Sequence, residues 1–152
     1  MVKKIAILAA LGSLAMMLGA WGFQYIGDMA PCELCLWQRW PHKIAIGLGI
    51  VMFVLPNRWI ALLGALAILV GAGIAFYHAG VELKLWAGPD TCTGLPELGS
   101  TLTLDALWER PVVRCDDIPW SLFGISMAGW NGIVSLGLAV IWLLSFRAGG
   151  KR

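Results

Sequence analysis

The stretch LWQRWPHKIAIGLGIVMFVL, residues 36–55, decides whether this chain crosses a membrane three times or four. Its apolar part, residues 44–55, forms about 18 Å of helix, which is too short for roughly 30 Å of hydrocarbon. A helix over the whole stretch is long enough, although it carries Arg39, His42 and Lys43 in its first two turns. Long basic side chains near a helix end can extend to the interface. We therefore expect a membrane span over residues 36–55.

The overall composition is that of a membrane protein. Apolar residues make up 59% of the 152 residues, charged residues make up 13%, and the mean hydropathy is +0.79. Soluble domains average about 45–50% apolar and about 25% charged. Because three further uncharged runs are long enough to cross, the sequence predicts an all-α, polytopic membrane protein, a four-transmembrane-helix bundle in one domain over residues 1–152. The expected spans are residues 5–23, 36–55, 59–77 and 122–146, and the expected outer loops are residues 24–35 and 78–121.

Basic residues set the expected orientation. With four spans, both termini and the turn at residues 56–58 share one side, which carries six Lys or Arg residues and no acidic residue. The other side carries five basic residues and all nine acidic ones. Cytoplasmic segments are rich in Lys and Arg, so we expect cytoplasmic termini and two outward loops. A cleaved signal peptide over the first span is the alternative, but the apolar run is long and Leu18-Gly19-Ala20 is a poor cleavage site.

All four cysteines lie in the expected outer loops, Cys32 and Cys35 in the first and Cys92 and Cys115 in the second. Disulfides persist outside the cytosol, so both pairs can form them. Structural disulfides explain the second pair well, because a bond across a long loop constrains that loop. They explain Cys32 and Cys35 poorly, because a disulfide within Cys-x-x-Cys closes too short a loop to add much stability. A zinc site fits by ligand type, whereas c-type haem requires histidine where Leu36 stands. Redox exchange fits the spacing and the side of the membrane best.

The surroundings of Cys35 suggest an electron acceptor in the lipid. Cys35 stands at the start of the expected second span, where a helix N-terminus stabilises a thiolate and lowers the thiol pKa. Arg39, four residues on, could stabilise that thiolate or polarise an acceptor's carbonyl oxygen; a snorkelling arginine is the alternative. Quinones are two-electron carriers dissolved in lipid. His78 closes the third span, where it could donate a hydrogen bond to a quinone oxygen, help to deliver protons, or simply be solvated.

Four segments carry a resemblance to a known family. They are PCELCLWQR (residues 31–39), YHAG (77–80), DTC (90–92) and VRCDDIPWSLFGISMAGWN (113–131). They resemble the bacterial disulphide bond formation protein B (DsbB) family, and the topology matches over nearly the whole chain. The resemblance implies an enzyme of the bacterial cytoplasmic (inner) membrane with periplasmic cysteine loops. It also implies a periplasmic DsbA-like thioredoxin-fold partner, with ubiquinone or menaquinone as a diffusible acceptor, and neither a bound metal nor nucleic acid.

The resemblance also implies a role for each site residue. Cys92 and Cys115 would form the disulfide that oxidises the partner, with Cys92 taking the mixed disulfide. Cys115 would then attack Cys32, and Cys35 would be released as the thiolate that faces the quinone. The implied site residues are the catalytic Cys32, Cys35, Cys92 and Cys115 and the cofactor-binding Arg39 and His78.

Two other functions stay open from the sequence. A non-catalytic membrane scaffold would keep its disulfides intact, or hold zinc, whatever the state of the quinone pool. A quinone-linked reductase would run the same relay in the opposite direction, and sequence alone does not give the direction of electron flow. The oxidising outer compartment favours net oxidation of substrate thiols.

Overall fold

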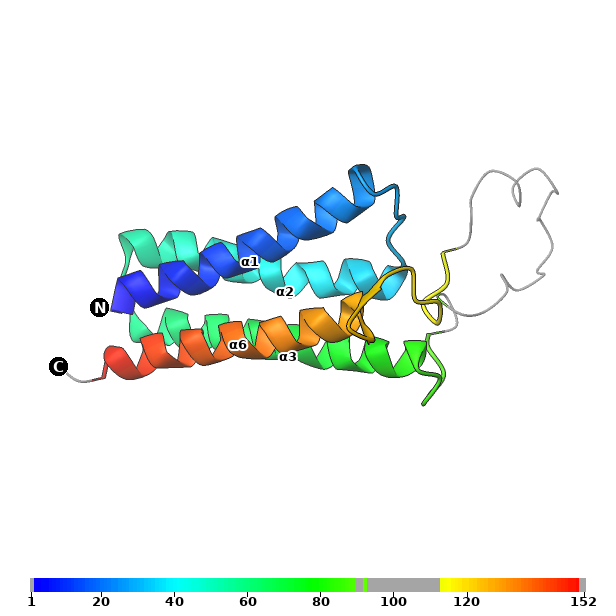
Figure 1. Cartoon of the computed structure of the whole chain (residues 1–152). Coiled ribbons are helices and arrows are strands. Elements are labelled where there is room, and N and C mark those ends of the chain that lie inside the picture. The colour runs from blue at the N-terminus through cyan, green and yellow to red at the C-terminus, as the bar shows by residue number, and fades with distance from the viewer. Residues whose placement is uncertain (1, 90–91, 93–112, 151–152) are drawn as a thin grey trace, which may run out of the picture.

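The computed structural model describes residues 2–89, 92 and 113–150, and within them four long helices run side by side as one bundle (Figure 1). The expected all-α fold is confirmed. The N- and C-terminal ends lie at one end of the bundle, with the α2–α3 turn, and the connection between α1 and α2 lies at the other (Figure 1). The helices are α1 (Val2–Tyr25), α2 (Glu33–Val54), α3 (Arg58–Glu82) and α6 (Met127–Ala148).

Three of the helices, α1, α3 and α6, are long and apolar enough to cross a membrane by length and composition. α2 is not among them, because basic and polar side chains occupy its first half. Its second half nevertheless exposes large apolar side chains, as the other helices do. Apolar surface of this extent marks contact with lipid or another apolar partner. Large apolar side chains that are more than half exposed include Leu11 on α1, Ile50 and Phe53 on α2, Val70 on α3 and Val140 on α6.

The start of α2 differs from the expected one. The helix begins at Glu33, three residues before Leu36. Its N-cap is Cys32, whose Sγ accepts a hydrogen bond of 3.2 Å from the Cys35 backbone N–H. The expected start is therefore three residues too late: Cys32 caps the helix, and Cys35 lies in its first turn. Cysteine is not among the residues that usually cap helices, so the sequence pattern did not indicate this start.

The last helix begins later than the expected residue 122. A short antiparallel hairpin precedes it, formed by β1 (Ser121–Leu122) and β2 (Ile125–Ser126). Phe123 and Gly124 make its turn with φ of 53° and 75°, the left-handed region that tight hairpin turns require. α6 can therefore start only at Met127. The hairpin and then α6 follow directly on the segment that contains Cys115.

Small residues bring the helices close together in the half of the bundle away from the cysteines. Trp142 of α6 is fully buried against Gly64 of α3, where a Cβ would lie 2.6 Å from the indole ring. Gly49 of α2 meets Ala10 of α1 in a similarly close approach. Contacts of this kind are typical of membrane bundles. Toward its C-terminal end, α1 inclines away from α6 (Figure 1).

Candidate active site

Two pairs of cysteines meet at the end of the bundle that carries the α1–α2 connection. Cys92 and Cys115 form a disulfide, with their Cα atoms 5.4 Å apart, while Cys32 and Cys35 are free. The sulfur atoms of Cys32, Cys92 and Cys115 all lie within 4.8 Å of one another. The structure therefore brings together two pairs that the sequence places in separate loops. Most of the expected second loop, residues 93–112, lies outside the described part of the chain.

The ends of α2 and α3 hold this cluster in place. Leu34 of α2 and Val81 of α3 pack against it, and both are buried. The backbone N–H of Cys115 donates a hydrogen bond of 3.1 Å to the carbonyl oxygen of Cys92. Cys32, like the two disulfide-bonded cysteines, is buried, whereas Cys35 is partly accessible. The sulfurs are thus fixed by packing at the ends of two helices.

Cys32 and Cys35 share a sulfur–sulfur contact. The Cys32 thiol donates to the Cys35 Sγ at a distance of 2.8 Å. This hydrogen bond, together with burial, raises the pKa of Cys32 well above its ordinary value. Cys32 is therefore the member of the pair that keeps its proton. Cys35 is the member placed to carry negative charge when the pair loses one proton.

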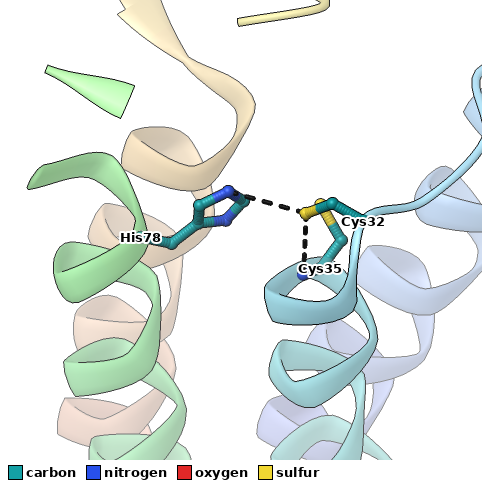
Figure 2. A group of neighbouring side chains, drawn as sticks. All are labelled: Cys32, Cys35 and His78. Atoms are coloured by element: carbon teal, nitrogen blue, oxygen red, sulfur yellow. Dashed lines mark hydrogen bonds between the residues drawn. The ribbon is translucent and has the colours of Figure 1, made fainter. Parts of the chain in front are cut away.

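Figure 2 shows the ring of His78, from α3, pointing toward Cys32 and Cys35 at the start of α2. Its Nε2 lies 3.6 Å from the Cys32 Sγ and 3.2 Å from the carbonyl oxygen of Cys115. The residue is only 2% exposed. The alternative of a solvated histidine is therefore wrong. His78 is buried between the two cysteine pairs.

A chain of hydrogen bonds behind His78 joins α3, α2 and α6. The Gln38 Nε2 lies 2.7 Å from the His78 Nδ1, and the Asn131 Nδ2 donates to the Gln38 Oε1 at 2.6 Å. The His42 Nε2 lies 3.0 Å from the Asn131 Oδ1. Amide nitrogens only donate, so Gln38 donates to the His78 Nδ1 and the proton of the neutral ring is on Nε2.

Gln38, His42 and Asn131 are not among the predicted site residues. A signal for them exists in the sequence, because polar side chains inside membrane helices are costly and usually functional. Gln38 and His42 also follow Cys35 by three and seven residues, which places all three on one face of a helix. No local pattern indicates that Asn131, on a distant helix, completes the chain.

Arg39 lies one turn beyond Cys35 and extends toward α1, where its Nη1 donates a hydrogen bond of 2.6 Å to the Gln24 Oε1. Beside it is a cavity of about 610 Å³ bounded by α1, α2, α6, the end of α3, the α1–α2 connection and the segment before the hairpin. Its walls are mostly apolar and include Met16, Phe23 and Trp130. Its polar lining includes Cys32, Cys35, Gln38, Arg39, His78 and Glu82.

Glu82 is the last residue of α3 and lies one turn beyond His78. Its Oε1 is 3.9 Å from the His78 Nε2, and its side chain is 3% exposed. Its Oε2 has no hydrogen-bond partner among the described residues. Glu82 is also absent from the predicted site residues, although its spacing from His78 places both on one face of the helix.

The geometry bears on the zinc alternative. Cys32, Cys35 and His78 hold three potential ligand atoms within 4.8 Å, and so do Cys32, Cys92 and Cys115. In the second group two of the sulfurs are joined to each other. Zinc binds thiolates, so a site that uses all four cysteines would require this disulfide to be reduced.

Comparison with known proteins places the chain in a family. The family model for "Disulfide bond formation protein DsbB" matches residues 2–145. A disulfide bond formation protein B from Mannheimia succiniciproducens is 32% identical over 94% of this chain and 86% of its own length. One from Shewanella amazonensis is 33% identical over 88% of this chain and 83% of its own length. No solved structure gives a significant match. The chain belongs to the DsbB family of disulfide bond formation proteins, which are polytopic membrane oxidoreductases.

Proposed function

We propose that this protein is a thiol:quinone oxidoreductase. It reoxidises a DsbA-like thioredoxin-fold dithiol protein in the periplasm and passes two electrons to membrane quinone. The observation that carries the proposal is the approach of the Cys32, Cys92 and Cys115 sulfurs to within 4.8 Å. Thiol–disulfide exchange requires such an approach. A purely structural disulfide gives no reason for a free cysteine pair beside it.

The first part of the reaction exchanges disulfides. A thiolate of the partner attacks Cys92 and releases Cys115 as a thiolate, which attacks Cys32 in a Cys32–Cys35 disulfide and releases Cys35. The partner's second thiol then displaces Cys92 and leaves as a disulfide. Attack of Cys92 on Cys115 restores their bond and releases Cys32. Two electrons thus pass from the partner to the Cys32–Cys35 pair, and the structure has the bonding of this final state.

The cavity beside Cys35 fits a quinone head group. Its volume of about 610 Å³ is within the range of small-molecule sites, about 300–1,000 Å³, and its apolar walls suit a ring that arrives from lipid. Arg39 would hold a carbonyl oxygen through guanidinium donors that Gln24 does not occupy. His78 lines the same cavity, and its Nε2–H, which in the structure lies 3.2 Å from the Cys115 carbonyl oxygen, would be a second donor to the quinone. Ubiquinone or menaquinone would supply a two-electron, two-proton acceptor there.

We place the protein in the bacterial inner membrane with both termini in the cytoplasm. Support comes from the end of the bundle shared by the termini and the α2–α3 turn (Figure 1), whose segments carry six basic residues and no acidic ones. The cysteine cluster lies at the opposite end, toward the periplasm. Disulfides such as Cys92–Cys115 persist in that oxidising compartment. The same compartment favours oxidation of the partner over the reductase direction.

The test is anaerobic quinone reduction. Detergent-purified protein is mixed with ubiquinone and a reduced thioredoxin-fold dithiol protein, and quinone absorbance and thiol content are followed. We expect quinone loss that matches thiol loss and that vanishes in Cys35→Ser. The matched control is Lys43→Gln, an exposed position on the same helix that does not line the cavity.

Three other outcomes would overturn this proposal. Absence of quinone loss with both ubiquinone and menaquinone would favour the scaffold, and a zinc assay would then separate structural disulfides from a metal site. Reduction of the partner's disulfide by added quinol, without the reverse reaction, would favour the reductase. Quinone loss that persists in Cys35→Ser would remove the proposed relay.

A further inference from the structure

The proposed relay leaves one buried acid of the site unused. Glu82 ends α3 with a side chain that is 3% exposed, and its Oε2 has no hydrogen-bond partner among the described residues. It lines the same cavity as Cys32 and Cys35. A buried carboxyl with an unpartnered oxygen is costly unless it has a function.

The chemistry at Cys32 needs a proton acceptor. Each time Cys32 and Cys35 return to a disulfide, the Cys32 sulfur must attack as a thiolate. In the structure, however, Cys32 keeps its proton, which forms a hydrogen bond of 2.8 Å to the Cys35 sulfur. Cys32 is buried, so bulk water is a poor acceptor for this proton. A neighbouring group has to take it.

His78 is the nearest basic group, but its hydrogen bonds leave no free site for this proton. Its Nδ1 accepts from Gln38, which is oriented by Asn131. The ring proton therefore lies on Nε2, the atom that faces Cys32 at 3.6 Å. The Nε2–H thus faces both the Cys115 carbonyl oxygen at 3.2 Å and the Cys32 sulfur, where it would stabilise a thiolate. His78 is not placed to accept the proton.

The other charged groups on the cavity are less suitable. Asp28 and Asp117 line it but are exposed to solvent, and Arg39 and Arg114 are cations without an acceptor atom. His42 lies at the far end of the amide chain, beyond Asn131. Glu82 is the buried carboxyl among the described lining residues, 3.9 Å from the His78 Nε2.

We propose that Glu82 accepts the proton of Cys32 as Cys32 attacks the Cys35 sulfur. The Cys32 S–H bond breaks, and its electron pair forms the S–S bond. Its proton passes to the Glu82 carboxylate through water in the cavity that both residues line. The group bonded to Cys35 leaves with the other electron pair. In turnover the electron pair goes to the acceptor, which in the proposed function would be a quinone held beside Cys35 by Arg39. The inference rests on that function only in that Cys32 and Cys35 cycle between dithiol and disulfide.

An aromatic disulfide can isolate this step without quinone. In a full-length Cys92→Ser/Cys115→Ser background, dithiobis(nitrobenzoate) loads the reactive Cys35 in a bimolecular phase and releases one coloured thiolate. Attack by Cys32 then releases the second thiolate in a phase whose rate does not depend on reagent concentration. Stopped-flow absorbance resolves the two phases. The comparison is between Glu82→Gln, Glu82→Asp and the matched control Glu33→Gln, a carboxyl next to Cys32 that does not line the cavity.

We expect Glu82→Gln to slow the second phase about a hundredfold or more, the usual contribution of a positioned proton acceptor. The loading phase should persist and should not slow, because Gln removes the negative charge of Glu82, which disfavours the Cys35 thiolate; a persistent loading phase shows that the site is folded. The slowed rate should rise with pH as hydroxide replaces the carboxylate, and Glu82→Asp should lie between the two. A second phase in Glu82→Gln equal to that of Glu33→Gln at every pH would overturn the inference. Because no quinone is used, this result is independent of the test of the proposed function.

Discussion

The Nδ2 of Asn131 on α6 donates a hydrogen bond of 2.6 Å to the Oε1 of Gln38 on α2, 93 positions earlier in the chain. This bond turns the Gln38 amide so that its nitrogen faces His78 on α3. The packing of α6 therefore determines which nitrogen of His78 carries the ring proton. An apolar residue in place of either amide would leave that choice open.

The Gln38–Asn131 bond predicts a measurable coupling. Gln38→Leu leaves the Asn131 Nδ2 and the His78 Nδ1 without partners, and each buried orphan costs about 1–3 kcal/mol. Asn131→Leu removes hydrogen-bond partners of the Gln38 Oε1 and of the His42 Nε2, at similar cost. The double variant should be more stable than the sum of the two losses predicts, by about 0.5–3 kcal/mol. Denaturant unfolding in detergent measures all three, and strictly additive losses would show that the amides do not interact.

The sulfur cluster predicts which cysteines can cross-link. With Cys35 and Cys92 changed to serine, Cys32 and Cys115 should form a disulfide readily, because their sulfurs lie within 4.8 Å. The control, with Cys32 and Cys92 changed to serine, leaves Cys35 and Cys115, which do not share such a group. Mass spectrometry of peptides from the non-reduced protein gives both yields. Equal yields would contradict the closer approach of Cys32, compared with Cys35, to the Cys115 sulfur.

Arg39 predicts a change in quinone affinity without a change in thiol exchange. A hydrogen bond to a charged group contributes about 1.5–3 kcal/mol, so Arg39→Leu should raise the KM for quinone about tenfold or more. Gln24→Leu should raise it less, because Arg39 loses only its anchor on α1. The rate of exchange between the partner and Cys92 should stay the same. Steady-state kinetics measures these values, with Lys43→Gln as the control. An Arg39→Leu variant whose KM for quinone equals that of the control would refute this role.

The raised pKa of Cys32 predicts slow alkylation. A thiol reacts as its thiolate, and the hydrogen bond to Cys35 holds the Cys32 pKa high. In the reduced protein, iodoacetamide should therefore modify Cys32 slowly at neutral pH and faster as the pH rises. Cys35→Ala removes the acceptor, so the Cys32 pKa should fall and alkylation at a given pH should quicken. Residue-resolved mass spectrometry tests this, and an unchanged pH profile in Cys35→Ala would argue against the bond.

Much of the fold follows from the sequence because long apolar runs have few alternatives in lipid. The runs over residues 5–23 and 59–77 become α1 and α3, and the ambiguous stretch 36–55 is a helix that packs between them. The ends are less predictable. Cys32 caps α2 although cysteine is rarely used there, and a hairpin of six residues delays α6 to Met127.

The site is only partly readable from the sequence, for a physical reason. Spacing along one helix indicates which side chains share a face, so Cys35 and Arg39 can be grouped in advance. The approach of Cys115 to Cys32, and of Asn131 to Gln38, depends on how separate helices pack. Glu82 is conspicuous only once its burial is known, because a carboxylate at a helix end normally reaches water.

The chain of amides behind His78 carries no net charge. Gln38 and Asn131 therefore hold three helices together without an ion in the apolar interior, and salt cannot screen their hydrogen bonds as it screens a surface ion pair. The Arg114–Asp116 pair beside Cys115 is of that screened kind, because Arg114 is exposed. A rise in ionic strength in the outer compartment should therefore weaken the Arg114–Asp116 pair beside Cys115, while the alignment of His78 with Cys32 stays constant.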